Sequence, residues 1–169
     1  MLKAPLAATA VLAASIALPA FAQDYPKYQI SIHNGSEGRS CSAVAYPSDA
    51  EGQADRHSRS YVAVTYRVGE GDAEFAAAPG FDVASNGDFR VKVVGGGPAS
   101  SFHLWMHDGA GFSVSEGQER MLVSSLEKAR ELVLTATPSN RRQSVKHIYD
   151  MSEFGRKMEA ARSRCGRGD

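Results

Sequence analysis

Apolar and polar residues alternate along most of the chain beyond residue 27, which is the period of half-buried β-strands. The clearest runs cover residues 28–33, 61–68, 89–94 and 101–107, and weaker ones cover 41–46, 74–77, 81–85, 111–114, 131–137 and 143–149. Segments rich in Gly, Asn, Asp and Pro separate these runs. About eight or nine short strands with regular turns predict a mainly β fold, namely a β-sandwich carrying two peripheral α-helices.

The apolar period changes to that of an α-helix in two places. The first is residues 119–129, where Leu122, Leu126 and Ala129 form one stripe. The second is residues 152–165, whose apolar stripe consists of Phe154, Met158, Ala161 and Cys165. A helix this short is marginal alone in water, so we expect the stripe of the second helix to pack against the rest of the domain.

Two connections carry specific expectations. The sequence Asn86-Gly87-Asp88 lies between apolar runs at 81–85 and 89–94, and Asn-Gly tolerates the positive φ of tight hairpin turns. These two runs are therefore predicted to pair as a hairpin. Residues 47–60 contain no apolar period and are predicted to form a surface loop.

The first 22 residues have the pattern of a secretory signal peptide. Lys3 precedes an apolar run at 6–18, and Ala20-Phe21-Ala22 places small residues at a cleavage site. An uncleaved membrane anchor is the alternative, but the apolar run is short for a span of about 20 residues. Cleavage would leave residues 23–169 as a single exported domain, periplasmic or secreted.

The chain contains two cysteines, Cys41 and Cys165. In an exported protein such a pair most simply forms a disulfide, and no C-x-x-C motif suggests redox chemistry. Cys165 also lies on the apolar stripe of the last predicted helix. We predict a Cys41–Cys165 disulfide; two free thiols, one of them reactive, are the alternative.

Charge gives little indication of a partner. Without Lys3 the exported chain has 18 Lys/Arg and 19 Asp/Glu, a net charge of −1 (18 − 19). This balance does not suggest binding to nucleic acid or to an anionic membrane surface, and no second apolar stretch reaches transmembrane length. The sequence leaves the oligomeric state open.

Motifs for catalysis are weak. The segment Gly111-Phe-Ser113-Val-Ser115 lacks the second glycine of a nucleophile elbow. The glycines at 95–97 lack the lysine and the following helix of a phosphate-binding loop. We therefore predict no catalytic residues, no cofactor and no metal.

Residues 101–107 contain the one cluster with a functional interpretation. Phe102, Leu104 and Met106 alternate with His103, Trp105 and His107, as on a strand. On a strand the two histidines would be about 13 Å apart, too far to bind one metal ion at about 2 Å each. His103, Trp105 and His107 form an outward row that is a candidate binding surface, unless a helix or loop of the protein covers Trp105.

The order of several segments resembles the invasion-associated locus B family of bacterial envelope proteins. The segments that carry this resemblance are 41–47, 61–71, 102–104, 131–137, 149–154 and the helical Cys165. The resemblance covers residues 27–165 and implies an exported, immunoglobulin-like sandwich. It also implies a role in host-cell invasion or envelope stress, with no agreed enzymatic activity and no catalytic residues to transfer.

The leading functional interpretation is a non-enzymatic exported protein that contacts a protein partner at the bacterial envelope or a host surface. One alternative is an envelope hydrolase or metal-dependent enzyme whose site cannot be recognised from sequence. Another is a structural or chaperone-like envelope component. A concave pocket with converging polar groups would favour the enzyme.

Overall fold

The computed structural model describes residues 26–36, 38–51, 60–140 and 142–165. The predicted signal peptide lies outside these residues. The described elements, in chain order, are β1 (Tyr28–Gly35), β2 (Gly38–Ala45), β3 (Asp49–Glu51), β4 (Tyr61–Arg67), β5 (Ala73–Ala78), β6 (Phe89–Val94), β7 (Ser100–His107), β8 (Ala110–Ser113), α1 (Glu116–Leu126), β9 (Glu131–Ala136), β10 (Val145–Asp150) and α2 (Phe154–Cys165).

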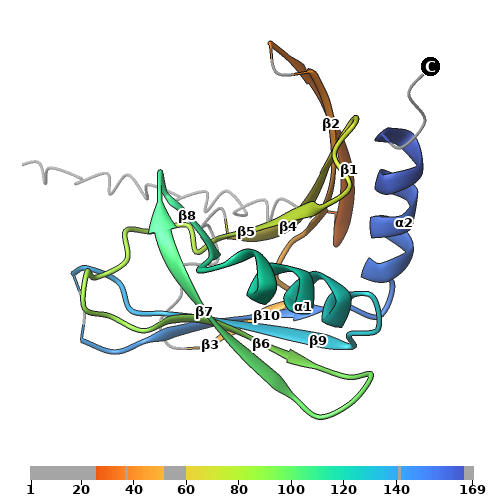
Figure 1. Cartoon of the computed structure of the whole chain (residues 1–169). Coiled ribbons are helices and arrows are strands. Elements are labelled where there is room, and N and C mark those ends of the chain that lie inside the picture. The colour runs from red at the N-terminus through yellow and green to blue at the C-terminus, as the bar shows by residue number, and fades with distance from the viewer. Residues whose placement is uncertain (1–25, 37, 52–59, 141, 166–169) are drawn as a thin grey trace, which may run out of the picture.

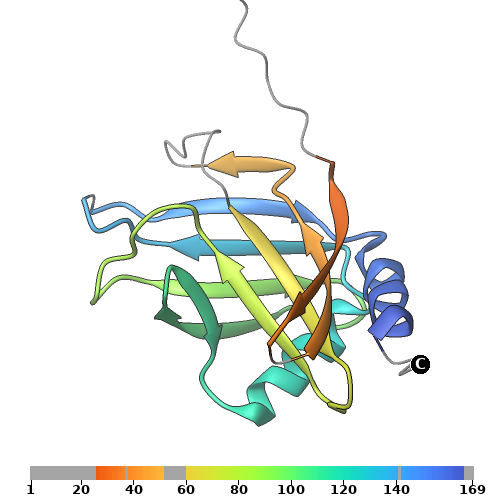
Figure 2. The same cartoon turned by 90° about the horizontal axis from the view of Figure 1, so that it is seen from above.

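The predicted mainly β character is confirmed. All strand pairs are antiparallel, and the ten strands form one hydrogen-bonded sheet in the order β1-β2-β4-β5-β8-β7-β6-β9-β10-β3. The sheet curls, so that β4 and β5 cross over β9 and β10 (Figures 1 and 2). β7 joins the two halves, because its residues 100–103 pair with β6 and its residues 104–107 pair with β8.

One local prediction is wrong, and a second is wrong only for part of the residues that it covers. Residues 81–85 do not pair with β6; instead Val83 bridges Pro138, while β6 lies between β7 and β9 and has no free side. The segment at 47–60 contains the short strand β3, which pairs with β10. Its remaining residues 52–59 lie outside the described part of the chain. Both errors have one cause: the pairing partners are distant in sequence.

The two predicted helices are present. α1 begins at Glu116, three residues before the predicted start at 119, because the hydroxyl of Ser115 accepts a hydrogen bond from the Gln118 N–H and caps the helix. α1 packs on β5, β6 and β8. Its buried residues Leu122 and Leu126 belong to the predicted stripe.

α2 packs across β2, β1 and β4 (Figure 1). Its buried residues are the predicted stripe: Phe154, Met158, Ala161 and Cys165. Cys165 is joined to Cys41 by a disulfide with a Cα–Cα distance of 5.7 Å, within the usual range. The predicted pairing of these two cysteines is therefore present, and it ties the last helix to the second strand.

The start of β1 is bonded to Asp150, the last residue of β10. The Lys27 ammonium pairs with the Asp150 carboxylate, which also accepts a hydrogen bond from the Ser152 N–H at 2.9 Å. The hydrogen bond from Lys27 lowers the pKa of Asp150 most, and the bond from Ser152 lowers it further. The Tyr28 hydroxyl donates to the Asp150 carbonyl at 2.7 Å. The first strand is thus anchored to the strand that leads into α2.

Neither described helix combines the length and apolar character needed to cross a bilayer.

Candidate functional site

The outward face of β7 carries the predicted row of residues. Phe102 and Leu104 are buried, and Met106 is partly buried against the core. His103, Trp105 and His107 are exposed on the opposite face. The Trp105 side chain is 49% exposed, so no described helix or loop covers it. The geometric part of the prediction is therefore confirmed: the only tryptophan of the chain lies at the surface.

Trp105 is held in one place although it is exposed. Its indole N–H donates to the Ser113 carbonyl of β8 at 3.0 Å. Its ring centroid lies 5.3 Å from that of His107 and 6.1 Å from that of Phe112, the residue directly opposite on β8. A tight turn, with φ of 47° at Asp108 and 80° at Gly109, connects β7 to β8 and sets this register.

Two further exposed apolar residues follow β8 along the chain. Val114, which follows β8, is 58% exposed, and Met121 on α1 is 66% exposed. The Gln118 side chain donates to the His103 carbonyl at 2.7 Å and so joins α1 to β7. Met121 lies one helical turn beyond Gln118. We call this set of residues the Trp105 surface: His103, Trp105, His107, Phe112, Val114 and Met121.

The Trp105 surface does not assemble a nucleophile and a base. Ser113 pairs with Leu104, so its side chain lies on the inward face of the hairpin, opposite to that of His103. Its hydroxyl has no hydrogen-bond partner among the described residues. Ser115, the other serine of the weak elbow motif, caps α1. These positions do not support a serine hydrolase.

A metal site is not supported by the described residues either. They contain no group of three or more His, Cys, Asp or Glu side chains that could hold an ion. His107 instead faces the carboxylate of its neighbour Asp108, with Nε2 3.4 Å from Oδ2.

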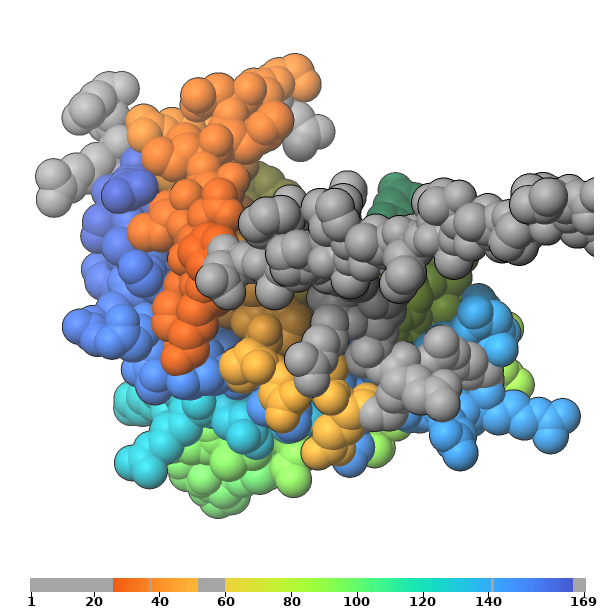
Figure 3. Space-filling model, turned by 180° about the vertical axis from the view of Figure 1, so that it is seen from behind, coloured from red at the N-terminus to blue at the C-terminus, as the bar shows by residue number. Residues whose placement is uncertain are grey.

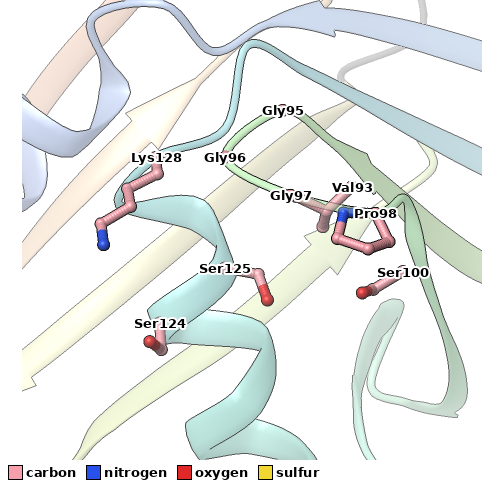
Figure 4. Close-up of a pocket in the computed structure, with 9 residues that line it drawn as sticks. All are labelled: Val93, Gly95, Gly96, Gly97, Pro98, Ser100, Ser124, Ser125 and Lys128. Atoms are coloured by element: carbon pink, nitrogen blue, oxygen red, sulfur yellow. The ribbon is translucent and has the colours of Figure 1, made fainter.

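A polar depression of about 260 Å³ lies between the glycine-rich loop 95–98 and α1 (Figure 4). The structure brings Lys128 to this loop, a lysine that the sequence alone did not place there. In Figure 4, however, the Lys128 side chain extends away from Ser100 and Ser125. The Ser125 hydroxyl already donates to the Met121 carbonyl at 2.7 Å.

Packing accounts for two of the three glycines of this loop. A Cβ at Gly96 would lie 2.7 Å from the Lys128 Cβ, and Gly96 has a φ of +74°. At Gly95 a Cβ would lie 2.7 Å from the Arg130 backbone nitrogen. At these two positions the loop approaches the α1–β9 connection too closely for a side chain. Nothing here requires an anionic ligand.

A second depression, of about 340 Å³, lies on the outer face of β1, β2, β4 and β5. Hydroxyl, amide and apolar side chains line it, among them Gln29, Ser42 and Thr65, and the hydroxyls of Ser42 and Thr65 are 2.8 Å apart. Among the residues that the structure describes, no carboxylate or imidazole lines either depression. Converging acid–base groups, the feature expected of an enzyme, are absent from both.

Two ionisable groups that are partly or fully buried, Glu119 and Tyr149, bond to other elements of the fold. Glu119 accepts a hydrogen bond from the Phe75 N–H at 2.6 Å and so ties α1 to β5; burial raises its pKa, although this bond acts in the opposite direction. The Tyr149 hydroxyl lies 2.6 Å from that of Ser60, which donates to the Ala78 carbonyl, and burial raises the pKa of Tyr149. Burial lowers the pKa of His147.

Sequence analysis missed three members of the Trp105 surface: Phe112, Val114 and Met121. The hairpin register places Phe112 opposite Trp105. Val114 follows β8, and Met121 belongs to α1, which the Gln118 side chain joins to β7. The turn Asp108-Gly109 was the available signal, because Asp-Gly favours a two-residue hairpin that would have paired Phe112 with Trp105.

Comparison of the chain with protein-family models, with curated proteins and with solved structures gave no match.

Proposed function

We propose that this chain is an exported, non-enzymatic protein of the bacterial envelope that binds a protein partner through the Trp105 surface. We also propose that the chain is related to the invasion-associated locus B family. In this proposal the curled sheet corresponds to the immunoglobulin-like sandwich of that family. Export and family relationship rest on the sequence patterns alone. The disulfide is compatible with an oxidising compartment.

The observation that carries the binding proposal is the state of Trp105. Its side chain is about half exposed, while its indole N–H is already bonded to the Ser113 carbonyl. A partner would therefore meet an apolar ring without having to satisfy the polar atom. Because neighbouring rings and this hydrogen bond hold the side chain, little conformational entropy is lost on binding. Tryptophan is also among the residues that most often dominate protein interfaces.

The lone tryptophan makes a direct test possible. We expect the mature chain labelled with 5-fluorotryptophan to give one fluorine resonance in the NMR spectrum, because residue 105 is the only position labelled. Titration with fractionated envelope extract, or with host-surface extract, should broaden or shift that resonance when a partner covers the ring. A fraction that binds the chain without changing the resonance would place the contact elsewhere.

Capture experiments provide the matched control. Trp105→Ala should strongly reduce recovery of the partner found in the titration. Val68→Ala, which removes an apolar side chain that is 41% exposed, should leave recovery unchanged. Equal recovery with wild type, Trp105→Ala and Val68→Ala would contradict the proposed binding surface.

A further inference from the structure

β1 forms one end of the sheet, and no other described strand pairs with its outer side. The Tyr46 N–H donates to the Lys27 carbonyl at 3.1 Å. This bond shows which alternate residues, counted from Lys27, direct their backbone groups toward β2. In an antiparallel ladder, alternate residues direct both backbone groups toward the partner strand and the others direct them away. The residues of β1 whose N–H and C=O groups point to the free side are therefore Tyr28, Ile30, Ile32 and Asn34.

The two ends of the sheet are protected to different degrees. β3, at the other end, has three residues, of which Asp49 and Glu51 are acidic. Short length and charge are the features by which proteins prevent a sheet edge from pairing with another chain. β1 has eight residues and contains neither a charged residue nor a proline. By these criteria β1 is an unprotected edge.

The edge is also anchored at its first residues and partly apolar. The contacts of Lys27 and Tyr28 with Asp150 anchor its first residues. Its side chains alternate, with Tyr28, Ile30 and Ile32 on the face covered by α2 and Gln29, Ser31 and His33 on the other face. Ile32 remains 42% exposed. In Figure 3, β1 and β2 lie at the surface beside α2.

We propose that two copies of this chain pair antiparallel through β1, about a two-fold axis at Ser31. In this register Ile30 lies opposite Ile32 of the partner subunit, and Tyr28 lies opposite Asn34 of the partner subunit. Each of these pairs exchanges two hydrogen bonds, so every outward backbone group of the four residues gains a bond. The two sheets become one continuous sheet through the axis.

A second copy fits this edge better than an unrelated strand chosen at random. Across the axis Ser31 meets its own copy and Gln29 meets His33 of the partner subunit, so no carboxylate or ammonium faces another. The arrangement uses the same edge in both copies. Among the described strands, the only sheet edges that stay unpaired are the two β3 strands, which are short and acidic. The arrangement therefore closes as a dimer and does not extend into a fibre.

The position of α2 leaves room for the second copy. α2 contacts β2 most extensively, one strand inside the edge. The two β2 strands would be three strand spacings apart, about 14 Å. This distance exceeds the 8–10 Å of close helix packing, so the two α2 helices do not collide. They would flank Ile30 and Ile32 of both copies and reduce the exposure of Ile32.

Cysteine cross-linking tests the register. In the mature chain, Ser31→Cys places two thiols opposite each other at the axis, at about 4.5 Å between Cα atoms, so mild oxidation should give a covalent dimer. His33→Cys is the matched control on the same strand and face. In a dimer of His33→Cys the two introduced thiols would be about 13 Å or more apart, so this variant should not cross-link with itself. A mixture of His33→Cys and Gln29→Cys should cross-link as a heterodimer.

Sedimentation velocity over a range of concentrations tests the dimer itself. We expect the mature wild-type chain to dimerise reversibly, and Ile32→Lys to weaken dimerisation by about tenfold or more. Val68→Lys alters a residue of equal exposure away from the edge and should dimerise like wild type. A wild-type monomer at all concentrations, or equal cross-linking of Ser31→Cys and His33→Cys, would overturn the proposal. Because these readouts need no partner of Trp105, the result is independent of the proposed function.

Discussion

The indole nitrogen of Trp105 donates a hydrogen bond to the carbonyl oxygen of Ser113, 3.0 Å away on the adjacent strand. The bond orients the ring along the β7–β8 hairpin, beside Phe112 and His107. It uses the one polar atom of the side chain within the protein, and the exposed part of the ring is therefore entirely apolar.

Trp105→Ala should have only a small effect on stability. The side chain is about half exposed, so its loss should lower the free energy of unfolding by about 1 kcal/mol, the usual net contribution of one hydrogen bond plus limited packing. Phe75→Ala, at a fully buried aromatic, should lower it by about 3–5 kcal/mol. Urea denaturation of both variants makes the comparison. Similar losses for the two would show that Trp105 is a structural residue.

Removing the disulfide should loosen α2 more than the sheet. In the Cys41→Ala/Cys165→Ala variant, we expect the free energy of unfolding to fall by about 2–5 kcal/mol, because the bond closes a loop with a sequence separation of 124. A helix of 12 residues depends on tertiary contacts. Amide hydrogen exchange should therefore accelerate more in α2 than in β6 and β9. Uniform acceleration across all three elements would contradict this.

His147 should make the protein less stable in acid. It is 1% exposed, neither ring nitrogen has a hydrogen-bond partner among the described residues, and burial lowers its pKa. Above the unfolded pKa of about 6.5, neither state is protonated and stability is unaffected. As the pH falls below that value, the unfolded state gains a proton that the folded state resists, so stability decreases by up to about 1.4 kcal/mol per pH unit until the folded pKa is reached.

His147→Met removes the titrating group and keeps an apolar side chain of similar volume. We expect the difference in free energy of unfolding between His147→Met and wild type to grow in favour of the variant as the pH is lowered from 7 to 5. Thermal or urea denaturation at several pH values measures this difference. A constant difference across that range would show that His147 does not control acid stability.

Two adjacent glycines should respond differently to alanine. Gly96→Ala places a Cβ 2.7 Å from the Lys128 Cβ at a φ of +74°, so we expect a loss of about 1–3 kcal/mol in the free energy of unfolding. Gly97 has no atom within 4 Å of a built Cβ, and Gly97→Ala should change stability by about 0.5 kcal/mol or less. Equal effects would mean that the loop does not pack on Lys128 as described.

Local sequence patterns predicted the parts of this fold that depend on local physics. The alternation around Trp105 correctly divided β7 into a buried and an exposed face, because strand period alone determines that division. The helical stripe of Phe154, Met158, Ala161 and Cys165 is buried as expected. The cysteine pairing was predictable because only two cysteines were present.

Pairing between distant segments was not predictable in the same way. Asn86-Gly87 forms a turn, with the Gly87 N–H bonded to the Ala84 carbonyl, but the residues before it bond to Thr137 and not to β6. β3 exists because β10 offers a free edge, and no apolar period of its own marks it. The composition of the Trp105 surface likewise depends on register and helix packing, which a single sequence does not specify.

The disulfide also determines how the molecule would respond to mechanical force. A pull between the start of β1 and the end of α2 reaches the Cys41–Cys165 bond after extending only β1 and the first residues of β2. Once β1 has separated from β2 and from Asp150, the segment enclosed by the bond, with its sequence separation of 124 and a stretched length of roughly 400 Å, is bypassed and bears no load. Single-molecule stretching should release that hidden length only after reduction. While the bond is intact, tension applied at the two ends leaves β7 and the Trp105 surface in place.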